Sequence, residues 1–464
     1  MVKMVLMLML IGWNDSTDVV VDEHDGGVAI FPSQDNPEVL YMAHIQWEDD
    51  SLRILKSTDG GQTWEVVTSI DKSYYYRLGG LAVMPGDTLF VSYRSDSDGL
   101  LKLIKLDSEG NIINSITVDT VISYPTMVTD VEYYPSNPWF YITYDIAGGV
   151  IKYAVYNKNL NLIVEKVAFD IAGECFQYPW IAMDSIGVRY IVARSTTSGS
   201  VWWYNDWAQG AEYFEYFDTT GGREYYYPAI DINPEDGRIL ITALGKNYSS
   251  ETGRLYYAWT TDLGTTWYVD SFVDTFRHYC AIPVVKNTPS GKWYIIANLY
   301  KNNEKRLVAF VTTDIFSGSW DTIDISYRND IRVYRKYISA YYVPDQDLIV
   351  AWSVLWPSPY YTYFDREAGW TGIEEKEKVV SMPGLRIKIA SVLKPYSDFA
   401  LVLSKDADVS IKVLSIDGRV VSKIHSGLLS SGEHKFNIGN LKPGVYMLKV
   451  DANRTLVKKF VIAK

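Results

Sequence analysis

The chain has 464 residues, of which 47% are hydrophobic, and a formal net charge of −12 at pH 7. This length allows two or three domains, and the apolar content suffices for a large folded core. The acidic balance argues against nucleic acid and anionic membranes as main partners, because both attract basic surfaces.

The first segment, MVKMVLMLMLIG, has one lysine followed by an apolar stretch from Met4 to Ile11. The pattern predicts a signal peptide within residues 1–18, since the stretch is too short to span a bilayer as a helix. A frayed or mis-started N-terminus is the alternative, because the charge is single and no small-residue cleavage site follows. No other segment approaches transmembrane length, so we expect no integral membrane segment.

A repeated turn organises residues 19–373. An Asp or Asn follows a short strand rich in β-branched and aromatic residues seven times, and the six steps cover 306 residues, a mean of 51. The turn residues are Asp59, Asp107, Asn157, Asp206, Asp262, Asp314 and Asp365. Such a period predicts an all-β chain with a radially repeated four-stranded sheet, which is a seven-bladed β-propeller.

Two of these turns share a fuller pattern with a structural role. In each, a carboxylate caps turn N–H groups, a glycine takes a positive φ and an indole covers the hairpin. The residues are Ser57, Asp59, Gly61, Thr63 and Trp64 in one turn, and Thr260, Asp262, Gly264, Thr266 and Trp267 in the other. They resemble the Asp-box (BNR repeat) of sialidase-like β-propellers. The resemblance covers roughly residues 20 to 375 and implies the fold without implying sialidase chemistry.

A ligand site is expected at one opening of the channel. In an up-and-down sheet, the segment leading into the next sheet shares a face with the turn between the second and third strands, and the Asp turns lie opposite. Tyrosine faces suit sugar rings and arginine forks suit carboxylates or sulfates, although packing between blades is the alternative role. The predicted ligand-binding residues are Tyr76, Arg77, Tyr124, Tyr178, Arg223, Tyr226, Arg277, Arg335, Trp47 and Trp356.

Catalysis is left open by the sequence. The sialidase-like resemblance implies a Tyr–Glu nucleophile pair and an acidic proton donor, for which Glu224 with a neighbouring tyrosine and Asp49 are candidates. The Arg-Ile-Pro element of that family is absent ahead of the first blade, which weighs against hydrolysis of sialic acid. In a polysaccharide lyase, by contrast, His278 or Tyr279 beside Arg277 would abstract a proton next to a uronate carboxylate.

We expect no resident cofactor, since no zinc or haem spacing occurs. Calcium is a weaker option at a group of acids that more often form solvated loops. These acids are Asp49, Asp50, Asp96 and Asp98. The two cysteines, Cys175 and Cys280, allow one disulfide or two unpaired thiols.

The composition changes after residue 373. The charged, proline-containing segment that follows predicts a linker over 374–384, and short strands predict a small Ig-like β-sandwich over 385–464. Four motifs there appear in a fixed order: VLSIDGRVV at 413–421, SGEH at 431–434, LKPGVY at 441–446 and KKFV at 458–461. They resemble the C-terminal sorting domain of type IX secretion substrates. This resemblance implies an extracellular or cell-surface location, with the outer-membrane secretion machinery as a partner.

Taken together, these patterns predict a secreted or surface-displayed propeller that binds glycans, acidic ones in particular, at the channel mouth. A glycan-degrading hydrolase or lyase is the second hypothesis. An extracellular protein–protein scaffold is the third.

Overall fold

The computed structural model divides the chain into two compact units, Met1–Ala368 and Gly369–Lys464. The structure describes residues 18–462 except 25, 47–50, 122–124, 132–133, 185–186, 207–209, 214–222, 234–236, 248–251, 263, 273–275, 278–282, 289–290, 302–303, 327–331, 344–347, 357–360, 367–376, 383–384, 391, 394–395, 404, 416–418, 443 and 453–454. For several strand segments, including 71–77, 223, 276–277, 332–337 and 355–356, the description is limited to the backbone.

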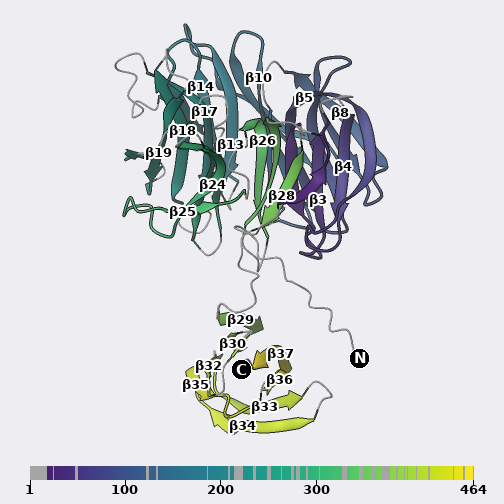
Figure 1. Cartoon of the computed structure of the whole chain (residues 1–464), viewed down its shortest axis with the longest axis vertical. Coiled ribbons are helices and arrows are strands. Elements are labelled where there is room, and N and C mark those ends of the chain that lie inside the picture. Colours follow the sequence, from purple (N-terminus) through teal and green to yellow (C-terminus); the bar gives the residue numbers. More distant parts are fainter. Residues whose placement is uncertain are drawn as a thin grey trace. The chain divides into compact units, whose positions relative to one another are not determined.

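In the described part of the first unit, every regular element is a strand, and the strands pair antiparallel in groups of four (Figure 1). The first group is β2 (Val28–Pro32), β3 (Leu40–Ile45), β4 (Ser51–Ser57) and the start of β5 (Glu65–Met84). The second is the end of β5 with β6 (Thr88–Ser95), β7 (Leu100–Leu106) and β8 (Ile112–Thr120). The third is β9 (Thr126–Thr129), β10 (Trp139–Ile146), β11 (Val150–Asn157) and β12 (Leu162–Phe169).

The later groups continue the pattern. They are β13 (Phe176–Met183), β14 (Arg189–Ser195), β15 (Val201–Asn205) and β16 (Gly210–Tyr213), then β17 (Arg223–Ile232), β18 (Ile239–Asn247), β19 (Thr252–Thr260) and β20 (Tyr268–Ser271). Next come β22 (Val284–Asn287), β23 (Trp293–Lys301), β24 (Glu304–Thr312) and β25 (Asp321–Asp324), with the short β21 (Phe276–Arg277) linking β19 to β23. The last is β26 (Arg332–Tyr342), β27 (Leu348–Trp356) and β28 (Thr362–Arg366), completed by β1 (Val19–Asp22).

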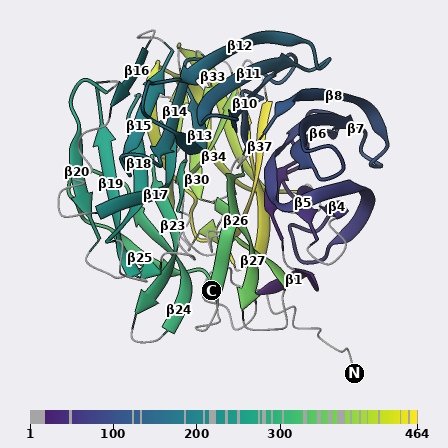
Figure 2. The same ribbon diagram turned by 90° about the horizontal axis from the view of Figure 1, so that it is seen from above.

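The sheets stand side by side in a ring, in the order of the sequence (Figure 2). Their first strands line a common cavity, and apolar side chains fill the space between neighbouring sheets. Phe90 of β6 stacks on Phe140 of β10 in this way, with ring centroids 4.0 Å apart. The all-β prediction is confirmed, and the arrangement is that of a β-propeller.

The ring closes because β1, from the beginning of the chain, pairs with β28, the last strand of the unit. A buried polar cluster lies at this seam. The His44 side chain is fully buried, with Nδ1 3.4 Å from Asp22 Oδ2 and Nε2 3.0 Å from Thr362 Oγ1. Arg53 donates to the same Asp22 oxygen at 3.2 Å, and Thr362 donates to the His24 carbonyl at 2.8 Å. The cluster therefore ties residues near position 22 to residues near position 362.

Six of the seven repeated Asp or Asn residues lie where the third strand of a sheet ends and the chain turns to the fourth. Asp365 differs, because it lies within β28 and the fourth strand of its sheet is β1, from the start of the chain. Asp262 Oδ1 accepts the Thr260 hydroxyl at 2.7 Å and the Thr266 N–H at 2.8 Å, and Asp59 makes matching bonds with Ser57 and Thr63. Hydrogen bonds from the turn lower the pKa of Asp262. Asp206 differs, because it bonds to Arg189 and to the Tyr153 hydroxyl.

The Asp262 turn gives a first test of the packing. Gly264 has φ +95°, and an added Cβ would lie 2.3 Å from the Trp203 ring. We expect Gly264→Ala to destabilise the propeller by about 1–3 kcal/mol, since the ring must shift. Gly318→Ala is the control, because Gly318 also has a positive φ but its added Cβ would meet nothing closer than 3.5 Å. Equal thermal midpoints for the two variants would contradict this packing.

The second unit contains two sheets that share one apolar core. One sheet is β29 (Glu377–Met382), β30 (Leu385–Ala390), β32 (Asp398–Leu403) and β35 (Gly432–Asn437). The other is β31 (Val392–Leu393), β37 (Thr455–Ile462), β36 (Gly444–Asp451), β33 (Ala407–Ser415) and β34 (Val420–Leu429). Leu401 of the first sheet and Ile411 of the second belong to the same buried cluster. Residues 377–382 fall within the predicted linker, but in the structure they form β29 and pair with β30.

Candidate functional site

One face of the propeller combines two kinds of segment. The start of β13 meets the turn after β10, since the Phe176 N–H donates to the Gly149 carbonyl at 2.8 Å. The start of β17 meets the turn after β14 in the same way, since the Tyr225 N–H donates to the Gly199 carbonyl at 2.8 Å. Both contacts place the start of a first strand on the same face as a turn between second and third strands, in agreement with the alternation of faces expected for an up-and-down sheet. We call this face the rim.

Irregular strand starts set the positions of the rim tyrosines. The pairing of β13 shifts register between Gln177 and Trp180, and that of β17 shifts between Tyr226 and Ala229. Within these bulges, Tyr178 and Tyr227 take left-handed backbone angles of φ 56° and 51°, each directly before a proline. Such conformations cost of order 1–3 kcal/mol for a residue with a Cβ. The two rings meet edge to face with centroids 5.1 Å apart.

A charged pair supports the tyrosines. Arg194, at the end of β14, donates to Glu224 Oε2 at 3.0 Å, and the Tyr226 hydroxyl donates to the same oxygen. The Arg194 guanidinium also lies 4.0 Å from the centroid of the Tyr226 ring. Arg194 and Glu224 are each only 7% exposed, whereas Tyr178 and Tyr226 are half-buried. The buried pair thus holds one face of Tyr226 in place.

The structure brings three predicted residues together at the rim: Tyr178, Tyr226 and Glu224. Tyr76, Arg77, Arg223, Arg277, Arg335 and Trp356 lie on described strands, but their side chains fall outside the description. Trp47, Asp49, Tyr124, His278 and Tyr279 lie outside the described residues altogether. The predictions for both groups therefore stay predictions.

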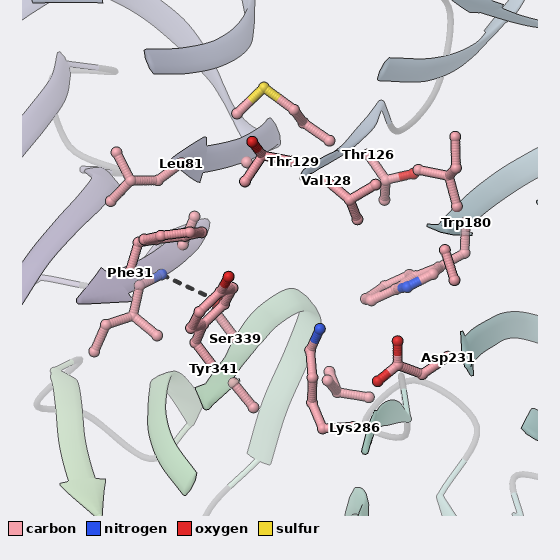
Figure 3. A pocket seen from close by; sticks show the side chains of 18 of the residues that line it. Phe31, Leu81, Thr126, Val128, Thr129, Trp180, Asp231, Lys286, Ser339 and Tyr341 are labelled. Carbon is pink, nitrogen blue, oxygen red and sulfur yellow. Dashed lines mark hydrogen bonds between the residues drawn. The ribbon is translucent and has the colours of Figure 1, made fainter. Parts of the chain in front are cut away.

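The first strands of the sheets enclose a cavity of about 700 Å³ (Figure 3). Most of its lining is apolar, from residues such as Leu81, Val128 and Ile338. Trp180 projects into it from β13 and packs against three of the apolar clusters that lie between sheets. The indole therefore lies near the middle of the ring.

Asp231 and Lys286 bring charge into this cavity, and the sequence reasoning missed both. The run IDINPEDG at 230–237 is typical of a turn between first and second strands, but Asp231 itself lies within β17 and lines the cavity. The true turn residue is Asn233, whose carbonyl accepts the Gly237 N–H at 2.9 Å. The available signal was a single charge beside apolar residues in each of two short runs, 229–232 and 284–286.

Metal and thiol chemistry has little support among the residues described. No group of three or more His, Cys, Asp or Glu side chains gathers there in a metal-binding arrangement. Asp98, one of the predicted calcium candidates, pairs with Lys102 at 3.1 Å, while Asp49 and Asp50 fall outside the description. Cys175 carries a free thiol, and Cys280 is not described.

Comparison with known families identifies the C-terminal unit. Residues 394–463 match the family model for the secretion system C-terminal sorting domain, so the predicted sorting domain is confirmed. The chain is therefore an exported protein of the cell surface or the extracellular space, and the secretion machinery is a partner of its tail. No helix in the described part of the chain is long and apolar enough to cross a membrane.

The propeller unit is similar in fold to carbohydrate-active proteins. An ulvan lyase matches with a TM-score of 0.51 at 9% identity, over 77% of this chain and 95% of that one. An α-L-arabinofuranosidase from Fusarium graminearum gives 0.46 at 11%, over 75% and 97%, and an α-L-arabinanase from Penicillium chrysogenum gives 0.43 at 11%, over 77% and 97%. A search of curated proteins returns no match. At these identities the likeness shows the β-propeller fold alone.

Proposed function

We propose that this exported propeller binds glycans at the rim. The observation that carries the proposal is a pair of half-buried tyrosine rings beside one opening of the channel. Tyr178 has a strained backbone, and the Tyr226 ring is held by the Arg194 guanidinium. Strained residues persist only where surrounding structure holds them, and they cluster at ligand sites. Flat aromatic faces that also carry hydroxyls suit sugar rings.

Acidic glycans are the proposed class, through arginines that precede the first strands. Arg194 is bonded to Glu224, so it braces the site and is not assigned to the ligand. Recognition of carboxylate or sulfate groups would then fall to Arg77, Arg223, Arg277 and Arg335. Trp47, Tyr76, Tyr124 and Trp356 would complete the binding surface.

We further propose seven blades of the sialidase-like Asp-box kind within 19–373, followed by a type IX sorting sandwich of Ig-like form. The described residues support the blade count, because seven first strands border the cavity: β2, β5, β9, β13, β17, β22 and β26. The matched bonds of the Asp59 and Asp262 turns support the Asp-box assignment.

A glycan-degrading hydrolase is the second candidate, and one contact favours it. The Tyr226 hydroxyl donates to Glu224 Oε2, which is the kind of Tyr–Glu pair that the sialidase-like resemblance implies. Arg194 also bonds to that oxygen, so the same carboxylate oxygen already accepts from two donors and serves a structural role. Binding without turnover therefore stays the first choice.

A glycan array followed by product analysis on acidic polysaccharides tests the proposal. Binding without cleavage is the expected result. Cleavage that is lost in Tyr226→Phe would favour the hydrolase, and absence of all glycan binding would overturn the proposal.

The rim tyrosines give a direct prediction. Tyr178→Ala and Tyr226→Ala should each weaken binding of the best array ligand roughly ten- to hundredfold, because a stacking surface is lost. Tyr268→Ala is the matched control, since Tyr268 is a half-exposed tyrosine on the outer strand β20. Titration calorimetry measures the affinities, and equal losses in all three variants would contradict the rim site.

A further inference from the structure

In the first strand of each of the seven described sheets, the residue one position before the last occupies an equivalent place. These residues are Phe31, Val83, Val128, Ala182, Asp231, Lys286 and Tyr341. At five of these seven described positions the side chain is apolar or aromatic. The exceptions are Asp231 and Lys286, which have opposite charges and lie on β17 and β22, whose strands contact each other.

We call these seven equivalent residues the charged layer. The charged layer lies towards the opening opposite the rim. Each first strand begins at the rim, so Tyr226 lies near the start of β17 and Asp231 lies one residue from its end. The two positions are five residues apart along the strand, which corresponds to about 15 Å. The charged layer is therefore a different site from the tyrosines of the rim.

The two charges have capacity left for a ligand. Asp231 Oδ2 accepts the Asn287 N–H at 2.7 Å, and Lys286 Nζ lies 5.7 Å from the centroid of the Tyr341 ring. Both side chains point into the cavity in Figure 3, which draws no hydrogen bond between them. Burial raises the pKa of Asp231, and the Lys286 charge partly opposes that effect.

The remaining polar groups around the layer are neutral. Thr129, Ser339 and Gln34 line the same cavity with hydroxyl and amide groups. The Tyr341 ring packs on Phe31 with centroids 4.0 Å apart, and Trp180 lies across the cavity from Tyr341 in Figure 3. The site thus offers one acceptor, one strong donor, two aromatic rings and several neutral polar groups.

We propose that this layer binds a neutral sugar through adjacent hydroxyls, as a second site independent of the rim. One hydroxyl donates to the Asp231 carboxylate while its neighbour accepts from the Lys286 ammonium, because a hydroxyl can do both. The C–H face of the sugar packs against Trp180 or Tyr341. A uronate is disfavoured, since its carboxylate would lie near Asp231 in a cavity of low polarity.

Titration calorimetry on the full chain tests this site with methyl glycosides of glucose, galactose, mannose and xylose, alongside methyl glucuronide and glycine. At least one neutral glycoside should bind, and Asp231→Asn and Lys286→Met should each weaken it roughly ten- to hundredfold. Lys56→Met should leave it unchanged. Lys56 is the matched control because it also lies over a tyrosine ring, 5.2 Å from the Tyr41 centroid, but outside the cavity.

A second measurement avoids dependence on the variants' folding. Reductive methylation of the wild-type chain, read by mass spectrometry, should show Lys286 protected by the neutral glycoside and Lys56 unprotected. The site is overturned if no neutral glycoside binds, if both variants bind as well as the wild type, if Lys286 gains no protection, or if glucuronide or glycine binds more tightly. Acidic polysaccharide binding, measured in the same variants, reports on the rim separately, since Tyr178 and Tyr226 are unchanged.

Discussion

Arg194→Met is expected to lower the free energy of unfolding of the propeller by about 3–5 kcal/mol. Arg194 and Glu224 are both buried, and their 3.0 Å ion pair joins β14 to β17 in the next sheet. Removing the guanidinium takes a cation away from the buried Glu224 carboxylate, to which the Tyr226 hydroxyl still donates. The loss of the cation over the Tyr226 ring adds a smaller cost.

Chemical denaturation of the wild type and of three variants measures this effect. Lys152→Met is the control, because Lys152 pairs with Asp119 and Glu165 across half-exposed positions, where an ion pair contributes about 0–1 kcal/mol. The double variant Arg194→Met with Glu224→Leu should recover much of the loss, since no charge is then buried alone. A loss below about 1 kcal/mol in Arg194→Met would show that the pair does not brace the rim.

Acid is expected to weaken the seam of the ring before it weakens the other sheets. Burial lowers the pKa of His44, although the nearby Asp22 carboxylate opposes this. The folded chain therefore keeps His44 neutral, while the unfolded chain takes up a proton as the pH falls below its ordinary value of 6.5. Unfolding becomes more favourable by about 1.4 kcal/mol at one pH unit below that value.

Protonation of Asp22 causes a second loss of stability, at a lower pH than the loss caused by His44. Burial alone would raise its pKa, but contacts with His44, His24 and Arg53 outweigh this and hold it far below the ordinary value. The ionised Asp22 side chain stabilises the folded state above pH 3.8, and this stabilisation is lost as the pH falls through the pKa of Asp22 in the folded chain. The seam should therefore lose stability in two stages, first through His44 and then through Asp22.

Thermal melting across the pH range from about 8 to 5 tests the first stage. His44→Asn should remove part of the acid sensitivity, and His434→Asn in the second unit should not, because His434 is half-buried and bonded to a local carbonyl. An unchanged pH slope in His44→Asn would contradict the assignment. Hydrogen exchange localised to β1 and β28 would show where the opening begins.

Local patterns predicted the repeat but not how its ends meet. Each Asp turn carries its own signal, because Asp59 and Asp262 bond within four residues of themselves. The seam joins residues more than 300 positions apart, such as His44 and Thr362, and nothing near either residue marks the other. A lone histidine in a strand therefore gave no hint of its structural role.

The residues of the two candidate sites show the same contrast between what the sequence predicts and what only the folded ring reveals. Tyr178 and Tyr226 could be placed at the rim from the strand order, because that depends only on alternation of turns between two faces. Asp231 and Lys286 are 55 residues apart and become neighbours only through the curvature of the ring. A carboxylate near the end of a strand also resembles a turn cap, so the sequence around Asp231 does not indicate that the residue lines a cavity.

A crystal structure of the full chain soaked with the best glycan from the array tests the central claim most directly. We predict sugar density at the rim, with one ring against Tyr226 or Tyr178 and an acidic group within reach of an arginine. Sugar bound solely on the outer strands, or on the second unit, would contradict a glycan-binding rim.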